Sequence, residues 1–225
     1  MIGTVFIDVD NTLLDFHACA RASMAQALAG HGIRCTDAMF DTFTRINDGL
    51  WLALERGELT RQELYRVRFN MIFAELGLAL DGGSFETQFR KNLDSAAEPV
   101  PGALPLLQYL SEKYTVCAAS NAAHAQQCSR LEKAGMLPYL REVFTSGRVG
   151  ADKPGRAFFD ACFALLPGAK PEETVMIGDS LTADICGAHD YGLKTCWFAP
   201  NGGVAPDGLR PNHTVRTLEE IRAFL

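Results

Sequence analysis

Short runs of β-branched and aromatic residues recur along the chain and predict buried strands. The first run covers residues 4–7, and comparable runs follow at 116–119, 143–145, 175–177 and 195–198. Continuous apolar runs of this length are typical of strands that are covered on both faces. The stretches between the later runs carry apolar residues at helical spacing. This alternation predicts an α/β fold with a mostly parallel, Rossmann-like sheet flanked by helices.

Residues 16–94 follow a different pattern, because no strand-like run occurs there and apolar residues recur at helical spacing. The segment is predicted to form about four helices. Residues that commonly begin or end helices mark the boundaries, namely Thr36, Gly57, the capping pair Thr60 and Glu63, and Gly77. We therefore expect a core domain at 1–15 and 95–225, with a helical domain inserted at 16–94.

Composition and charge narrow the range of partners. The 225 residues are 48% apolar, which is enough to bury a core and an inserted subdomain. The formal charge of −6 argues against a general basic surface for a nucleic-acid polymer. Seven scattered cysteines without a Cys-x-x-Cys pair predict free, mostly buried thiols. No apolar run is long enough to span a bilayer, so we expect no membrane partner and take the cytoplasm as the default location.

Polar residues suited to phosphate chemistry follow four of the predicted strands. The carboxyl ends of parallel strands meet at one edge of a sheet, where such folds bind ligands, so these residues are expected to lie together. They are Asp8 and Asp10 after the first strand, Ser120 and Asn121 after the second, Lys153 beyond the third, and Asp179, Ser180 and Asp184 after the fourth.

The chemistry of this set favours a magnesium and phosphate site. Asp8 and Asp10 are two apart on an extended chain and project similarly, and Asp179 would complete a site of hard oxygen ligands. Lys153 would offset the acids and the phosphoryl oxygens, and Ser120 offers a hydroxyl at a strand end. Each residue alone is commonly an ordinary cap or surface residue. The interpretation depends on their combination.

The four motifs resemble those of the haloacid dehalogenase-like (HAD) superfamily, in order and spacing, across essentially the whole chain. The segments that carry the resemblance are 8–12, 120–121, 153–154 and 178–184. The resemblance implies a Rossmann-like core, and it implies that the helical insert is a cap that closes over the active site and selects the substrate.

The resemblance also implies a mechanism. Asp8 would attack phosphorus to form an aspartyl-phosphate, and Asp10 would protonate the leaving oxygen and then activate water. Magnesium would be held by the Asp8 carboxylate, the Asp10 backbone carbonyl and Asp179. The remaining motif residues would act around these groups, with Asp184 and Ser180 supporting the metal ligands, and Ser120, Asn121 and Lys153 binding the phosphoryl group. The acid at position 10 distinguishes phosphate-ester hydrolysis from dehalogenation, because the dehalogenases of the superfamily lack it.

The helical insert resembles that of the bacterial pyrimidine 5'-nucleotidases of this superfamily, at residues 46–51, 55–61 and 68–69. Trp51 or Phe69 would stack on a base and Asn47 would bond its edge, although an amphipathic helix would also bury aromatic residues at this spacing. The expected substrate is a small phosphate ester, a pyrimidine nucleoside 5'-monophosphate. We expect a monomer or a small homo-oligomer.

Two alternatives remain open from the sequence. The nearer one is a sugar-phosphate phosphatase or a phosphomutase with the same core. The other is a non-catalytic, receiver-like regulatory domain, since receivers also combine clustered acids, a hydroxyl and a lysine on a parallel sheet. A receiver would be shorter and would lack the helical insert.

Overall fold

The computed structural model describes all 225 residues and divides the chain into two compact units. We call Met1–Asp15 together with Ala97–Leu225 the core unit, and Phe16–Ala96 the helical unit. All seven cysteines are free thiols. No helix in either unit combines the length and apolar character needed to cross a membrane.

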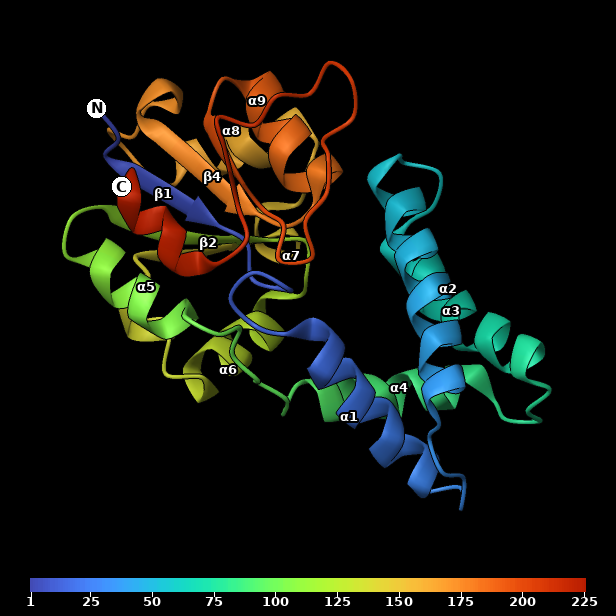
Figure 1. Ribbon diagram of the computed structural model, residues 1–225. Helices are drawn as coiled ribbons and strands as arrows, with labels where there is room; N and C mark the ends of the chain where they lie inside the picture. The colour runs from blue at the N-terminus through green and yellow to red at the C-terminus, as the bar shows by residue number, and fades with distance from the viewer. The chain divides into compact units, whose positions relative to one another are not determined.

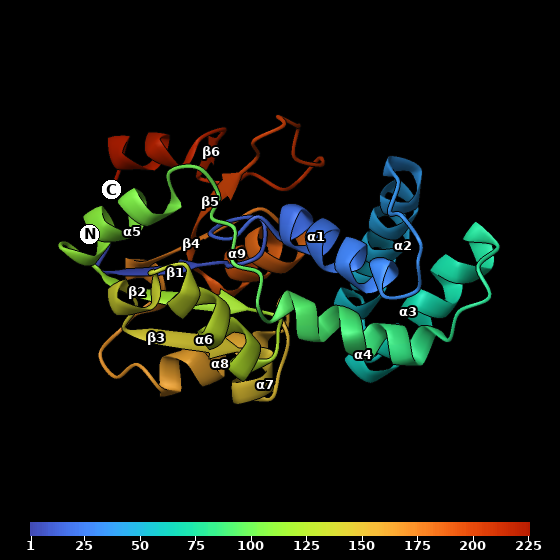
Figure 2. The ribbon, with the colours of Figure 1, turned by 90° about the horizontal axis from the view of Figure 1, so that it is seen from below.

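The core unit is built on a parallel sheet of six strands in the order β3-β2-β1-β4-β5-β6. Figure 2 shows the strands following one another in this order. The predicted parallel sheet is confirmed. The strands are β1 (Thr4–Ile7), β2 (Thr115–Ser120), β3 (Glu142–Thr145), β4 (Thr174–Gly178), β5 (Lys194–Phe198) and β6 (His213–Val215).

The sixth strand is absent from the sequence prediction. β6 has only three residues, and His213 and Thr214 are exposed, so it lacks the continuous apolar run that marks the other strands. It pairs with β5 and forms one edge of the sheet. The pairing partner, rather than a local pattern, defines this strand.

Alternation along β1 divides the core into two layers. Val5 and Ile7 belong to one apolar cluster with residues of α5 (Ala103–Ser111) and α6 (His124–Lys133). Phe6 points to the other face, where it packs with residues of α8 (Arg156–Ala164) and α9 (Gly187–Tyr191). Figure 1 shows these helices on the two sides of the sheet. The layers hold the strand ends in place.

Shorter segments complete the core unit. They are the one-turn helix α7 (Ser146–Val149), a π-helix at Leu181–Cys186, and 3-10 segments at Leu137–Tyr139, Pro171–Glu173 and Leu218–Ala223.

The helical unit contains four helices, the number expected from the sequence. They are α1 (Phe16–Ala29), α2 (Asp37–Glu55), α3 (Arg61–Leu76) and α4 (Gly82–Leu93). The Thr36 hydroxyl caps α2, and Thr60 and Glu63 form a reciprocal capping box at the start of α3. Gly77 ends α3 with a φ of 65°, in the left-handed region that favours glycine. The local signals therefore set these helix ends.

The core of the helical unit is aromatic. Its buried side chains include Phe43, Phe69, Phe73, Phe85 and Phe89, whose rings contact one another. These rings come from α2, α3 and α4, and their buried apolar surface packs the three helices together.

Candidate active site

The acidic motif begins where β1 ends, at the centre of the sheet. Ile7 lies opposite Ala118 of β2 and Ile177 of β4, so the two neighbouring strands end beside it. The Asp8 amide donates a hydrogen bond of 2.8 Å to the Ile177 carbonyl, which continues this pairing by one residue. Asp8 is therefore buried between the ends of β2 and β4.

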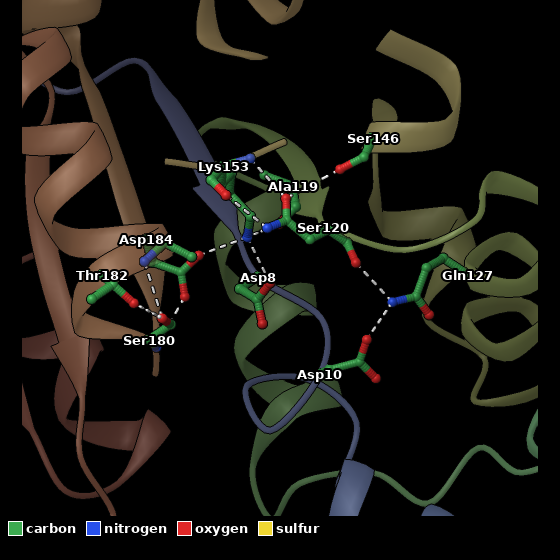
Figure 3. Close-up of polar contacts among 12 residues, drawn as sticks. Asp8, Asp10, Ala119, Ser120, Gln127, Ser146, Lys153, Ser180, Thr182 and Asp184 are labelled. Carbon is green, nitrogen blue, oxygen red and sulfur yellow. Dashed lines mark hydrogen bonds and ion pairs between the residues drawn. The ribbon is translucent and has the colours of Figure 1, made fainter. Parts of the chain in front are cut away.

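Lys153 connects the acids at this edge. Its Nζ atom donates to Oδ1 of Asp8 at 2.8 Å, to Oδ1 of Asp184 at 2.6 Å and to the Ala119 carbonyl at 2.6 Å. These contacts are drawn in Figure 3. An ammonium group has three protons, and here each has an acceptor. The lysine is only 1% exposed, and burial of the charge is balanced by two carboxylates.

Asn121 positions Lys153 through the backbone. Its Oδ1 atom accepts from the Lys153 amide at 2.8 Å and from the Ser146 hydroxyl at 3.1 Å, and its Nδ2 atom donates to the Lys153 carbonyl at 2.8 Å. Both polar atoms of the side chain therefore hold the chain around Lys153. Phosphate binding by Asn121 stays a prediction, and its side chain has a positioning role in addition.

Three carboxylates form the candidate cation site. Asp8, Asp179 and Asp184 each offer an oxygen, and these oxygens lie within 4.8 Å of one another. Gly178 permits the approach, because a Cβ at this position would lie 2.1 Å from the Asp184 carboxylate. Oxygen ligands at this spacing suit magnesium.

Hydrogen bonds hold the Asp179 to Asp184 segment. The Ser180 amide donates to Asp184 at 3.1 Å, and the Ser180 hydroxyl accepts from the Ala183 amide at 3.0 Å at the start of the π-helix. The indole nitrogen of Trp197 donates to the Asp179 carbonyl at 2.9 Å from β5. Trp197 was not identified from the sequence, since a strand aromatic gives no local sign of such a bond.

Burial and crowding raise the pKa values of the acids. Burial raises the pKa of Asp8 to about 7, with Asp184 and Asp10 adding to the effect and Lys153 opposing it. Burial, and then Asp8 and Asp184, likewise raise the pKa of Asp179 well above its usual range. For Lys153, burial lowers the pKa, but Asp184 and Asp8 outweigh it and the net shift is upward. A divalent cation among these acids would stabilise their ionised forms.

The Asp10 carboxylate points away from this cluster and towards α6. Its Oδ1 atom accepts from Arg130 at 2.6 Å, and its Oδ2 atom accepts from Gln127 at 2.6 Å. Gln127 also donates to the Ser120 hydroxyl at 2.8 Å, so it joins two of the predicted site residues. Gln127 and Arg130 were not predicted as site residues from the sequence, because polar residues on a helix are normally solvated. Their spacing of three, next to the buried Leu131, was the only available signal.

The three candidates in the helical unit have different environments. Phe69 is fully buried in the phenylalanine cluster, so its proposed role as a stacking surface for a base is not supported. Asn47 is also buried, and its amide oxygen accepts from Arg68 at 2.8 Å. Trp51 lies one turn after Asn47 on α2 and is partly exposed. Trp51 is therefore the aromatic candidate that keeps an accessible surface.

The fold and site define a class of protein, an α/β protein with an acidic site at the carboxyl edge of a parallel sheet. The family model of haloacid dehalogenase-like hydrolases matches residues 2–192. The chain belongs to this family and is a hydrolase.

Full-length relatives support the same assignment. The chain is 34% identical to the HAD-hydrolase YfnB of Bacillus subtilis over 222 residues, which cover 99% of this chain and 94% of YfnB. A crystal structure of YfnB bound to magnesium has a TM-score of 0.94 at 33% identity, over 99% of this chain and 97% of YfnB.

Two relatives are pyrimidine 5'-nucleotidases. PynA of Streptococcus pneumoniae is 33% identical, over 96% of this chain and 92% of PynA. YjjG of Escherichia coli is 29% identical, over 98% of this chain and 96% of YjjG.

Proposed function

We propose that this protein is a magnesium-dependent phosphatase that hydrolyses pyrimidine nucleoside 5'-monophosphates through an aspartyl-phosphate on Asp8. The observation that carries the proposal is the contact of buried Lys153 with Asp8 beside Asp179 and Asp184. A carboxylate held by a lysine next to a cation site is suited to attack a phosphoryl group. The lysine and a bound metal ion would both offset the negative charge of that group.

The first step transfers the phosphoryl group to the protein. An Asp8 oxygen forms a bond to phosphorus while the bond from phosphorus to the 5' oxygen breaks. Asp10, protonated at this stage, gives its proton to the leaving oxygen and releases the nucleoside. The side chain of Asp10 is 30% exposed, so a leaving oxygen or a water molecule can reach it for proton transfer.

The second step restores the enzyme. Asp10, now ionised, takes a proton from water as the water oxygen bonds to phosphorus, and the bond from phosphorus to the Asp8 oxygen breaks. Inorganic phosphate leaves, and Asp10 is again protonated. One residue thus serves as acid and then base, as reversal of the proton transfer requires.

The phosphoryl oxygens need donors during both steps. The hydroxyl of Ser120, the last residue of β2, is the proposed side-chain donor. The Lys153 ammonium group, whose protons contact Asp8, Asp184 and the Ala119 carbonyl, would act on the phosphoryl group through its charge. Asp8, Asp179 and the Asp10 backbone carbonyl would hold magnesium, with Asp184 and Ser180 supporting them. The ion would neutralise charge on the transferring group.

The substrate assignment rests on the helical unit and on the relatives. PynA and YjjG are both pyrimidine 5'-nucleotidases, and their matches extend through residues 16–96. Trp51 offers a partly exposed aromatic surface to a base, and Asn47 lies one helical turn before it. We propose that this unit acts as a cap and selects the pyrimidine.

A substrate panel tests the proposal. The purified protein would be assayed with magnesium for phosphate release from pyrimidine and purine nucleoside 5'-monophosphates and from sugar phosphates. We expect the highest kcat/KM with a pyrimidine nucleotide. Efficient turnover of sugar phosphates with nucleotides ignored would overturn the substrate assignment and favour a sugar-phosphate phosphatase.

An Asp8→Asn variant separates an enzyme from a receiver-like regulatory domain. The amide removes the nucleophile with little change in size, so we expect folded protein without turnover. Retained turnover would refute the role of Asp8. A wild-type protein that becomes phosphorylated but never releases phosphate would favour the regulatory alternative.

A further inference from the structure

Helix α6 carries two polar side chains that are fully withdrawn from solvent. Gln127 is 0% exposed and Arg130 is 1% exposed, although most other residues of this helix are polar and accessible. A buried guanidinium is costly unless its charge is paired, and arginine is among the residues least often buried. The buried guanidinium of Arg130 therefore needs an anionic partner, and this partner is the Asp10 carboxylate.

The three side chains form a closed ring of hydrogen bonds. Nη1 of Arg130 donates to Oδ1 of Asp10 at 2.6 Å and to Oε1 of Gln127 at 3.1 Å. Nε2 of Gln127 donates to Oδ2 of Asp10 at 2.6 Å. Both oxygens of Asp10 are thus held, each by a donor from the same helix.

The orientation of the Gln127 amide follows from its neighbours. Its oxygen must face the Arg130 donor and its NH2 group must face the Asp10 carboxylate, since the reverse orientation would oppose like partners. The second proton of this NH2 group is donated to the Ser120 hydroxyl at 2.8 Å. Figure 3 shows Gln127 between Ser120 and Asp10. The Gln127 amide thereby links the hydroxyl of Ser120, the proposed phosphate-binding group, to Asp10, the proposed acid and base.

We infer that Gln127 and Arg130 are positioning residues that aim the Asp10 carboxylate, and that Arg130 acts on the reaction only through it. The inference rests on the proposed function, in which Asp10 transfers protons in both steps. Asp10 lies beyond the end of β1, in a turn in which Asn11 has a φ of 61°. The contacts from helix α6 supply the restraint on its side chain there.

Loss of this restraint is expected to lower kcat more than it changes KM. Asp10 does not hold the ground-state phosphate in the proposed mechanism, so its displacement affects proton transfer rather than binding. Misplacement of an acid or base by about 1 Å can cost on the order of a hundredfold in rate. We expect a loss of this order for Arg130→Met and a smaller loss for Gln127→Met, because a charged donor holds a carboxylate more strongly than a neutral one.

A double-mutant cycle with the full-length protein and magnesium tests the inference. Steady-state kcat and KM for a pyrimidine nucleotide would be measured for the wild type, Arg130→Met, Asp10→Asn and the double variant. If Arg130 acts through Asp10, Arg130→Met has no further effect on kcat once Asp10 is replaced. Arg130→Lys should recover part of the loss, since it restores the charge without the planar fork. Arg222→Met is the matched control, because Arg222 is an exposed arginine of the same unit that contacts the Pro105 carbonyl.

The outcomes separate this inference from the proposed function. A wild type without turnover of any phosphate ester contradicts the proposed function. Two results with an active wild type would overturn the positioning role only. One is that Arg130→Met lowers kcat as much in the Asp10→Asn background as in the wild type. The other is that Arg130→Met changes KM and leaves kcat unchanged. If Arg130→Met does not fold, Arg130→Lys carries the same prediction, and a loss of kcat that persists in the Asp10→Asn background overturns it.

Discussion

The Nζ atom of Lys153 lies 2.8 Å from Oδ1 of Asp8, and the two residues are 145 positions apart in the sequence. The same nitrogen contacts Asp184 at 2.6 Å, so one buried cation lies between two buried carboxylates. The pair joins the end of β1 to the loop beyond β3 and holds the acidic site together. Both the stability of the core unit and its proposed chemistry depend on this contact.

Replacement of Lys153 is expected to destabilise the protein strongly. Lys153→Met leaves Asp8 and Asp184 without the cation between them, and removal of one partner of a buried ion pair costs roughly 3–5 kcal/mol. Urea unfolding without metal would measure the loss. Adding Asp184→Asn to this variant should recover part of it, because one buried charge is removed.

Lys170 provides the control for this comparison. It is exposed, and its Nζ atom lies 3.5 Å from Oε1 of Glu173. Replacement of such a surface lysine usually changes the free energy of unfolding by less than about 0.5 kcal/mol. A Lys153→Met protein as stable as Lys170→Met would contradict the proposed balance of charges.

Magnesium is expected to stabilise the protein through the acidic cluster. Ligand that binds only the folded state adds about 2.7 kcal/mol at a concentration of 100 Kd. Thermal unfolding with increasing magnesium should show a rising Tm for the wild type and a much smaller rise for Asp179→Asn. Glu172→Gln removes an exposed acid of the same unit and should respond like the wild type. An undiminished rise for Asp179→Asn would place the ion elsewhere.

The metal-free protein should lose stability as the pH rises towards neutrality. The pKa of Asp8 is raised from 3.8 to about 7, so the folded state binds a proton that the unfolded state has already released. The free energy of unfolding therefore falls as the pH increases between these two values, and this contribution levels off above them. Unfolding in EDTA at several pH values would measure it. Asp8→Asn lacks this proton, so its stability should fall less over the same range, and equal slopes would be inconsistent with the raised pKa.

Trp51 and Phe69 should respond differently to truncation. Phe69→Ala removes a buried ring from the aromatic core and should cost about 3–5 kcal/mol of stability, while KM for the remaining folded enzyme stays close to the wild-type value. Trp51→Ala should raise KM for a pyrimidine nucleotide and leave KM for p-nitrophenyl phosphate nearly unchanged. Met71, 47% exposed on the same unit, supplies a control as Met71→Ala. A specific KM effect from Phe69→Ala, with none from Trp51→Ala, would reverse the assignment.

Several structural features could be predicted from the chain because they depend on local pattern. The run at 4–7 matches β1, and the four later runs lie within β2 to β5. The capping residues Thr36 and Thr60 lie at the observed starts of α2 and α3, since a side chain that bonds a nearby amide acts within a few residues. Polar residues at strand ends could be grouped, because parallel strands in register end at one edge. Lys153 follows α7 and does not stand at a strand end, so its grouping with Asp8 depended on the motif set.

Other features depend on which side chains meet after folding. The contacts of Asp10 with Gln127 and Arg130 span 117 and 120 positions, and nothing in the helix itself identifies its partner. The side chain of Asn121 holds the Lys153 backbone, a role that its place after a strand did not indicate. For Phe69 the sequence left open both contact with a base and burial in the helical unit, and the structure buries it completely.

The sequence by itself determined the parallel sheet, the four helices of the insert, and the acids and hydroxyl near the strand ends. Local chain preference and the register of neighbouring strands are enough for this. Only the tertiary structure decided how Asp10 is held, what Asn121 binds and whether Phe69 is accessible. The physical reason is that burial and hydrogen-bond partners depend on packing between distant segments, and a polar or aromatic residue at helical spacing is compatible with either a solvated or a buried environment.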